Sequence, residues 1–521
     1  MKELIWHRQL LPAVDRFAGR PFLTDAGTGA TTTYGEHGRR VLKLADAMRT
    51  ELGVQPTDRV GVLSLNSARY EELYHATLLG AGVVNPLNLR FAPRELVHAL
   101  SDSATKVVFA DATFAPLLDS IREAAGLECV VLMGPPTDVP HDASYEGILA
   151  AGEEVTPPEP DEDAPAMLMY TGGTTGLPKG VLLDQRAVML TLYHIQMLLR
   201  IEPDDVYLAQ VPMFHAASMG AIIAAPIAGG RLVTVPFFEP EAVMAATETY
   251  RASNTIMVPT MLAMTFAHPA YAKERLATYA RLTYGASPMP RPVLDRLRRD
   301  LPHLRLYQGY GMTESAALVS CLLPEDHDRD DAVLGSAGRP VPGVTVTIQD
   351  DEGTVLPQRS VGEVCVRGGN LMREYWRRPE ETAQAFRGGW YHSGDAGYLD
   401  EEGYLYLVDR VKDMIVTGGE NVYSTEVEQA VAAHPAVAQV AVIGVPDDVW
   451  GEAVHAVVVL RPDAGVGEQE LIEHTRGLIA GYKVPKSIEF RAEALPLSGA
   501  MKVLKRELRA PYWAGRERAV N

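Results

Sequence analysis

Short apolar segments alternate with helical segments through the first half of this chain. Residues 60–63, 107–110 and 130–133 are apolar runs of strand length, whereas residues 36–53 and 69–79 have helical spacing. Strands separated by helices of this length are typical of parallel βαβ units. The pattern therefore predicts an α/β fold built on parallel sheets.

The pattern changes after about residue 340. Residues 344–349, 362–367 and 403–408 predict antiparallel strands separated by turns, and hence a β-rich subdomain. A compact α/β segment with its own helices and strands follows residue 410. Since 521 residues exceed what one hydrophobic core normally organises, we predict a large domain over residues 1–410 and a small domain over residues 411–521.

Composition excludes several classes of function. The net charge of −19 argues against nucleic acid as a partner, because binding to a phosphate backbone depends on excess Lys and Arg. No apolar run approaches the length of an integral membrane segment, and the N-terminus does not have the pattern of a signal peptide. Three widely spaced cysteines exclude a disulfide framework and a cysteine-based metal site. These features predict a cytoplasmic protein, with the oligomeric state open and a homodimer as one option.

The segment Tyr-Thr-Gly-Gly-Thr-Thr-Gly-Leu-Pro-Lys-Gly at residues 170–180 is the strongest functional signal. Its glycines let backbone N–H groups approach a ligand, and such groups form an anion-binding nest. The loop is not a Walker A motif, because no Ser or Thr follows its lysine. It predicts a polyphosphate site formed by Thr171, Gly172, Gly173, Thr174, Thr175, Gly176 and Lys179.

Further motifs carry complementary chemistry. In residues 307–314, two glycines between aromatic residues predict a tight turn, Thr313 can donate to a phosphate, and Glu314 offers an oxygen ligand for Mg²⁺. Asp395, after a Ser-Gly turn, can accept hydrogen bonds from a ribose diol.

Two features leave alternatives open. His215 is either a gate to a substrate pocket or a satisfied core histidine, and the small residues after it leave room either for a substrate or for tight helix packing. The basic residues Lys502, Lys505, Arg506 and Arg509, taken alone, are best interpreted as a solvated helix face.

In order and spacing, these motifs resemble those of the adenylate-forming superfamily of acyl-CoA synthetases, adenylation domains and luciferases. The resemblance covers nearly the whole chain. Residues 212–215, 308–311 and 418–423 are most similar to bacterial fatty-acyl-CoA ligases, which are acid–thiol ligases.

The resemblance implies a two-step reaction with ATP, Mg²⁺ and coenzyme A. The 171–179 loop would hold the β- and γ-phosphates, Thr313 the α-phosphate and Glu314 the Mg²⁺. Asp395 and Arg410 would hold the ribose, and Lys502 would be the catalytic cation of the first step. Adenine would be enclosed by Gly285, Ala286, Ser287, Gln308, Gly309, Tyr310 and Gly311.

In the second step, the small domain of such enzymes rotates and brings Gly418 and Gly419 to the active site. Lys412 occupies the hinge position of the family, the alternative being an ordinary exposed lysine. His215 corresponds to a position that often gates the acyl pocket.

The chain departs from the family pattern at two positions. Gly172 replaces a serine of the phosphate loop and removes one hydroxyl donor. Met501 replaces the glycine that normally precedes the catalytic lysine, and a left-handed backbone there would cost on the order of 1 kcal/mol or more.

The leading hypothesis is an AMP-forming acyl-CoA ligase of fatty-acid metabolism that activates a medium- or long-chain fatty acid. The alternatives are an aryl-acid CoA ligase for cinnamates or benzoates, an amide-forming ligase that passes the adenylate to an amine, and a non-catalytic acyl or nucleotide sensor.

Overall fold

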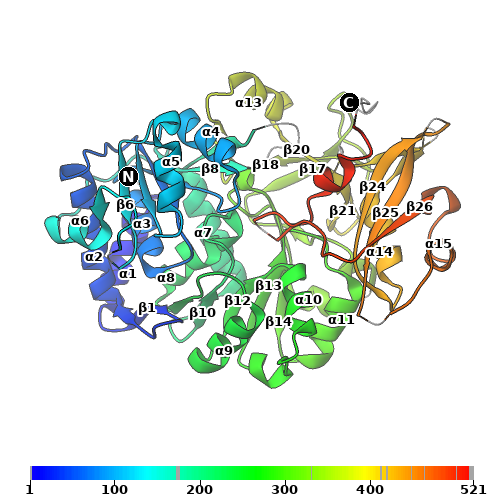
Figure 1. Ribbon diagram of the computed structural model, residues 1–521, viewed down its shortest axis with the longest axis horizontal. Coiled ribbons are helices and arrows are strands. Elements are labelled where there is room, and N and C mark those ends of the chain that lie inside the picture. The colour runs from blue at the N-terminus through cyan, green and yellow to red at the C-terminus, as the bar shows by residue number, and fades with distance from the viewer. Residues whose placement is uncertain are drawn as a thin grey trace.

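The computed structural model describes residues 3–135, 137–171, 177–329, 331–410, 413–417, 420–447, 449–462, 464–499 and 501–514, without the side chains of Asp331, Arg410 and Asn421. Within these residues, three sheets and their helices form a large unit, and a fourth sheet belongs to a C-terminal unit (residues 413–514) beside it (Figure 1). No membrane-crossing helix is found in this part of the chain, where every helix is too short or too polar for that role.

The first sheet confirms the predicted parallel βαβ pattern. Neighbouring strands β3 and β4, β3 and β5, and β5 and β6 all pair in parallel. Strand β9, which the sequence did not predict, closes the phosphate loop as an antiparallel hairpin with β8. In spatial order the strands are β19 (Glu374–Tyr375), β9 (Lys179–Asp184), β8 (Pro165–Thr171), β4 (Val83–Pro86), β3 (Arg59–Leu63), β5 (Val107–Ala110), β6 (Cys129–Leu132) and β7 (Ala143–Ser144).

The second sheet has a parallel centre and antiparallel edges. Its four central pairings, from β11 through β10, β12 and β13 to β14, are parallel, so the carboxyl ends of these strands share one edge. In spatial order the strands are β16 (Arg339–Pro340), β15 (Ser320–Leu322), β14 (Arg305–Tyr310), β13 (Arg281–Gly285), β12 (Asn254–Met257), β10 (Val206–Ala209), β11 (Arg231–Thr234), β1 (Pro21–Asp25) and β2 (Thr31–Thr33).

The third sheet is the predicted antiparallel subdomain, formed by β17 (Thr345–Gln349), β18 (Gly362–Arg367), β20 (Tyr391–Leu399) and β21 (Leu405–Arg410). The fourth contains β22 (Ile415–Thr417), β23 (Glu420–Val422), β24 (Val437–Asp447), β25 (Gly451–Leu460) and β26 (Ser487–Arg491). Its buried residues form hydrophobic clusters of their own, drawn from the C-terminal unit alone.

Helices cover these sheets. Those of the large unit are α1 (His7–Phe17), α2 (Tyr34–Thr50), α3 (Ala68–Leu78), α4 (Pro93–Ser103), α5 (Ala115–Ala125), α6 (Tyr145–Ala151), α7 (Gln185–Leu199), α8 (Ala225–Ala228), α9 (Pro240–Tyr250), α10 (Pro259–Ala267), α11 (Arg291–Asp300), α12 (Asp331–Leu334) and α13 (Pro379–Ala385). Those of the C-terminal unit are α14 (Ser424–Ala432), α15 (Glu468–Arg476) and α16 (Lys505–Arg509).

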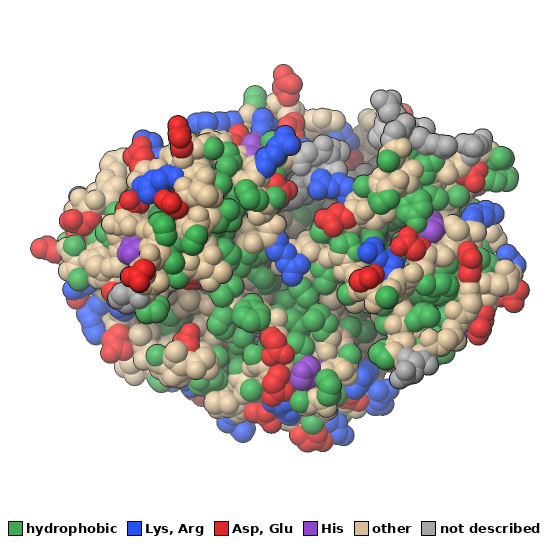
Figure 2. Space-filling model, viewed as in Figure 1, with side chains coloured by type: hydrophobic (Ala, Val, Ile, Leu, Met, Phe, Trp, Pro, Cys, Tyr) green, Lys and Arg blue, Asp and Glu red, His purple; other side chains and the backbone are tan. Residues whose placement is uncertain are grey.

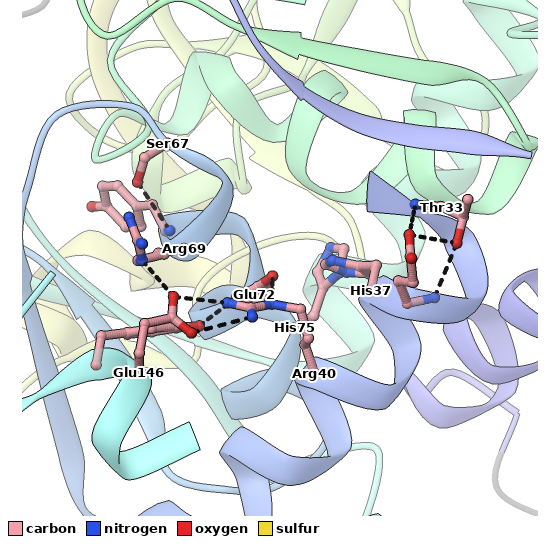
Figure 3. Close-up of polar contacts among 11 residues, drawn as sticks. Thr33, His37, Arg40, Ser67, Arg69, Glu72, His75 and Glu146 are labelled. Carbon is pink, nitrogen blue, oxygen red and sulfur yellow. Dashed lines mark hydrogen bonds and ion pairs between the residues drawn. The ribbon is translucent and has the colours of Figure 1, made fainter. Parts of the chain in front are cut away.

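Local capping fixes where α2 and α3 begin (Figure 3). The Thr33 hydroxyl accepts from the backbone N–H of Glu36 at 3.2 Å, and the Glu36 carboxylate accepts from the backbone N–H of Thr33 at 2.8 Å. Ser67 accepts from the backbone N–H of Tyr70 at 3.3 Å. Each bond satisfies an N–H group that has no partner inside its helix.

An ion cluster built around the buried Glu72 joins α2, α3 and α6 (Figure 3). The Glu72 side chain is 2% exposed and accepts from two nitrogens of Arg40 at 2.6 and 3.1 Å. It also accepts from the Tyr145 hydroxyl at 2.6 Å, and Glu146 accepts from Arg69 at 3.0 Å. Because the Glu72 charge is buried, loss of this pairing is expected to cost several kcal/mol.

Two buried histidines connect the same helices to the segment after His215. His37 Nε2 and His75 Nδ1 are 2.7 Å apart, and His75 Nε2 lies 2.9 Å from the carbonyl oxygen of Ile222. Ile222 belongs to a π-helical turn at Gly220–Ala224, a geometry that leaves backbone groups in need of such partners. The interior of the large unit therefore supports the backbone next to the candidate site.

Candidate active site

Residues from β13 and β14 meet at the shared carboxyl edge of the second sheet. Gly285 pairs directly with Gly309, and Ala286 follows with a left-handed φ of 64°. A Cβ atom on Gly285 would lie 2.1 Å from the carbonyl oxygen of Gly309, so only glycine fits there. The two segments expected to enclose adenine, residues 285–287 and 308–311, therefore lie side by side.

The expectation of a tight turn within residues 307–314 is wrong at Gly309, because residues 305–310 form strand β14, and the turn lies after the strand at Thr313–Ser315. Gly309 is held between Gly285 on one side and Cys321 on the other. The glycines serve close approach of backbone segments instead: a Cβ on Gly311 would lie 2.2 Å from the Ala317 carbonyl oxygen.

Asp395 reaches this edge from the third sheet. It lies within strand β20, opposite Arg410 of β21, and its carboxylate accepts from the Tyr310 hydroxyl at 2.7 Å. Two motifs 85 residues apart are thus in direct contact. The side chain of Arg410 lies outside the described residues.

Glu363 holds the turn that precedes Asp395. One of its oxygens accepts from the backbone N–H of Gly394 at 3.0 Å. The other lies 2.7 Å from His392 Nδ1 and accepts from Arg387 at 2.7 Å. The carboxylate therefore fixes the backbone from which Asp395 projects.

The end of the phosphate loop lies beside Glu314. Lys179 forms an ion pair with Glu381, and its ammonium lies 5.5 Å from the centre of the Tyr375 ring. Tyr375 donates to Glu314 at 2.9 Å; burial, followed by the Glu314 charge, raises the pKa of this tyrosine. Thr313 and Glu314 occupy a short 3₁₀ turn after β14.

Thr171 is described at the start of the loop, where it pairs with Lys179 across the β8–β9 hairpin. Gly172, Gly173, Thr174, Thr175 and Gly176 lie outside the described residues, as do Lys412, Gly418 and Gly419.

Lys502 approaches the same region from the C-terminal unit. We call residues 497–503, all described except Ala500, the Lys502 loop; in Figure 1 the red C-terminal segment reaches back over the large unit. The Ser498 N–H donates to the Lys502 carbonyl at 2.7 Å, and the Lys502 N–H donates to the Ser498 hydroxyl at 3.1 Å. Leu497 and Val503 pair as an isolated bridge, so the loop is a small hairpin.

His215 is close enough to Lys502 to sense its charge. Burial, and then the positive charge of Lys502, lower the pKa of His215 to about 3. His215 Nδ1 accepts from the Ala217 N–H at 3.1 Å, which places the proton of the neutral ring on Nε2. The histidine is therefore a neutral donor beside a cation.

The small residues after His215 do not all leave open space. A Cβ on Gly220 would lie 2.7 Å from the Tyr207 hydroxyl oxygen, so this glycine allows tight packing. In Figure 2, hydrophobic side chains cover the middle of the face on which the large unit meets the C-terminal unit.

The interpretation of the basic tail as a solvated helix face is wrong for two of its residues. Lys505 is 18% exposed and pairs with Glu428 at 2.7 Å, and Arg509 is 16% exposed and pairs with Asp413 at 2.9 Å. Both anchor the tail inside the C-terminal unit.

Sequence reasoning missed Tyr375 and Glu381, and also Arg90 and Thr260, which contact the Lys502 loop. None stands in a motif. Tyr375 reaches the site because β19 pairs with β9, a pairing between distant segments that local patterns do not reveal.

The fold and the converging residues define a class: an α/β protein of two units, in which the Lys502 loop of the C-terminal unit meets the large unit beside the second sheet. Residues 11–376 match the family model described as "AMP-binding enzyme", and residues 426–502 match its "AMP-binding enzyme C-terminal domain". The chain belongs to this AMP-binding enzyme family, the adenylate-forming superfamily expected from its motifs.

Relatives and solved structures agree. The chain is 38% identical to a feruloyl-CoA synthase of Amycolatopsis sp, covering 93% of this chain and 94% of the relative. It is 35% identical to the long-chain-fatty-acid–CoA ligase FadD13 of Mycobacterium tuberculosis, covering 94% and 95%. ATP-bound MatB from Rhodopseudomonas palustris superposes with a TM-score of 0.89 at 30% identity, covering 99% and 100%. The expected class, an AMP-forming acid–thiol ligase acting on acyl or aryl acids, is confirmed.

Proposed function

We propose that this protein uses ATP to convert a carboxylic acid to its acyl-adenylate and then transfers the acyl group to coenzyme A. The observation that carries the proposal is the Lys502 loop, which lies beside His215 while Tyr310 contacts Asp395 at the edge of the second sheet. Adenylation requires a cation near the reacting carboxylate and phosphate, and a surface that holds the nucleotide. We propose the domain boundary between residues 410 and 411.

ATP fits the residues at this edge. The close approach of Gly285 to Gly309 leaves flat backbone against which adenine can lie. Asp395 would accept from the ribose hydroxyls, and Arg410 would donate to them. Lys179 and the loop from Thr171 would hold the β- and γ-phosphates.

In the first step, a carboxylate oxygen would attack the α-phosphorus of ATP, and the bond to pyrophosphate would break. Two anions must approach one another, so preorganised cations and donors provide most of the stabilisation. Lys502 would lie between carboxylate and α-phosphate, and Thr313 would donate to the latter. Neutral His215 would border the acyl pocket and, because it carries no charge, would neither repel nor neutralise the Lys502 ammonium.

Mg²⁺ fits Glu314, a carboxylate beside the phosphate loop whose position is fixed by the Tyr375 hydroxyl. When bound, the ion would neutralise phosphate charge. Glu314 itself links the 3₁₀ turn to β19 through its hydrogen bond with Tyr375.

In the second step, the thiol of coenzyme A would attack the acyl carbonyl carbon, and AMP would leave with the oxygen that joined it to the acyl group. Lys502 has no role in this chemistry, so the C-terminal unit would rotate about Lys412 and present Gly418 and Gly419 instead.

We propose a medium- or long-chain fatty acid as the substrate, and with it a role in cytoplasmic fatty-acid metabolism. Similarity to FadD13 supports this choice. An aryl acid is the second candidate, favoured by the 38% identity to a feruloyl-CoA synthase.

The test is ATP–pyrophosphate exchange with purified protein over saturated C6–C18 acids, cinnamates and benzoates. Coenzyme A, or a panel of amines, is then added and the product weighed by mass spectrometry. Acid-dependent exchange followed by a CoA thioester supports the proposal. An amide product would show that an amine, and not coenzyme A, is the acceptor. The absence of exchange with every acid would refute adenylation.

A further inference from the structure

Met501 stands in an unusual backbone conformation directly before Lys502. Its φ is +60°, in the left-handed region that side chains other than glycine adopt at a cost. The hairpin explains this angle: the Met501 N–H donates to the Ser498 carbonyl at 2.9 Å, and the last residue of a three-residue hairpin loop commonly takes a left-handed conformation. A methionine here is therefore strained unless its side chain makes compensating contacts.

Those contacts are made with the large unit. The partly buried Met501 side chain packs against a hydrophobic cluster of the second sheet and its helices, which includes Val258, Met261 and Leu262. Its sulfur lies 3.9 Å from an Arg90 guanidinium nitrogen, which is a weak polar contact at most.

The backbone on either side of Met501 is fastened to the same unit. The Met501 carbonyl accepts from the Thr260 hydroxyl at 3.2 Å, and the Leu497 carbonyl accepts from Arg90 at 2.7 Å. A Cβ on Gly499 would lie 2.4 Å from Asn88 Oδ1 and 3.0 Å from the Phe214 ring, so the loop lies flush against the large unit.

We propose that Met501 is a positioning residue that holds the Lys502 loop on the large unit, favouring adenylate formation and slowing withdrawal of Lys502 for the second step. The inference rests on the proposed function and deepens it. The Met501 side chain, which makes the left-handed conformation of the loop costly, also anchors the loop to the large unit. Met501 stabilises the closed position, so its loss shifts the protein toward the position used for thioester formation.

The two half-reactions separate this role from a folding defect. The rate of adenylation is measured by pyrophosphate exchange. The rate of the second step is measured by thioester formation from supplied acyl-adenylate and coenzyme A. Met501→Ala keeps the left-handed strain and loses the packing, so adenylation should slow by about three- to tenfold while the second step is unchanged or faster. Met501→Gly loses the packing and the strain, so its adenylation rate should lie between those of Met501→Ala and the wild type.

Thr260→Val offers a second variant that leaves Met501 intact. It removes the hydrogen bond to the Met501 carbonyl and should move both half-reactions in the same directions as Met501→Ala, by a smaller factor. Met197→Ala, at a methionine that is 56% exposed on α7, is the matched control and should change neither. Equal losses in both half-reactions, no loss of adenylation in Met501→Ala, or faster adenylation in Met501→Ala than in Met501→Gly would overturn the proposal.

A distance measurement tests the same idea without knowledge of the acid. Nitroxide labels at Arg94→Cys on α4 and Glu507→Cys on α16, in a Cys129→Ser background, report on the two units by pulsed electron spin resonance. Met501→Ala should add a population with a longer distance, whereas unchanged distance distributions would contradict the proposed anchoring. If the wild type activates no acid, the proposed function fails, and the distances still decide whether Met501 anchors the loop.

Discussion

Gly285 and Gly309 face one another across paired strands, yet the structure predicts a much larger loss of stability when Gly285 is replaced by alanine than when Gly309 is. A Cβ at Gly285 would lie 2.1 Å from the Gly309 carbonyl oxygen, while a Cβ at Gly309 would have its nearest neighbour, Leu318 Cδ1, at 3.5 Å. The first contact is impossible without moving a strand, and the second is ordinary van der Waals contact.

The expected magnitude follows from two terms. Moving β14 away from β13 is opposed by its pairing with β15, and overpacking of this kind costs about 1–3 kcal/mol. The φ of 156° at Gly285 belongs to a region that is nearly restricted to glycine, at a cost of about 1–3 kcal/mol for other residues. Gly285→Ala should therefore lower the free energy of unfolding by about 2–6 kcal/mol, and Gly309→Ala by less than about 1 kcal/mol.

The assay is urea unfolding of the wild type and both variants, followed by circular dichroism, with ATP binding measured by calorimetry. Gly465→Ala, at a glycine with open space around its Cβ position, is the control for the substitution itself. If Gly309→Ala were as destabilising as Gly285→Ala, or if Gly285→Ala cost less than about 1 kcal/mol, the close approach of these strands would be refuted.

Three further predictions follow from other contacts. Glu72→Ala should lower the free energy of unfolding by about 1–3 kcal/mol in chemical denaturation, because it leaves the buried Tyr145 hydroxyl unpaired while Arg40, 28% exposed, keeps its pair with Glu146; Tyr145→Phe removes one hydrogen bond and should cost about 1 kcal/mol. Below about pH 6.5 the unfolded chain binds a proton at His215, whereas the folded protein, in which the pKa of this residue is about 3, does not. The free energy of unfolding should therefore be about 1–2 kcal/mol lower at pH 5 than above pH 6.5. Unfolding curves at both pH values should show a smaller loss in His215→Gln. Tyr310→Phe removes the 2.7 Å hydrogen bond to Asp395 and should weaken ATP binding by about three- to tenfold in calorimetry with little change in stability; an unchanged affinity would separate Asp395 from the nucleotide.

Where the sequence predicted an element of the fold, the signal was local, whereas the strands of the second sheet were not predicted. The apolar run at residues 107–110 is strand β5, and residues 362–367 are strand β18, as their patterns indicated. Strand β9 escaped prediction because the glycine-rich loop before it dominated the local pattern.

The site was predictable only where a motif marks it. Asp395 was expected at the ribose from its turn, but its contact with Tyr310 depends on how the third sheet packs against the second. The left-handed conformation considered for Met501 is present, with φ at +60°, while the contacts that anchor its loop come from Arg90, which donates to the Leu497 carbonyl, and from Thr260 on α10, segments with no signal of their own. Packing between distant segments set these contacts, and a single sequence does not encode them in any local pattern.

The central claim is that Lys502 is the cation of the first half-reaction alone. Lys502→Ala should reduce acid-dependent pyrophosphate exchange by at least about a thousandfold, as expected for loss of a preorganised charge in a water-poor site, while thioester formation from supplied acyl-adenylate stays within about threefold of the wild type. Equal loss of both half-reactions, or adenylation that persists without Lys502, would contradict the account.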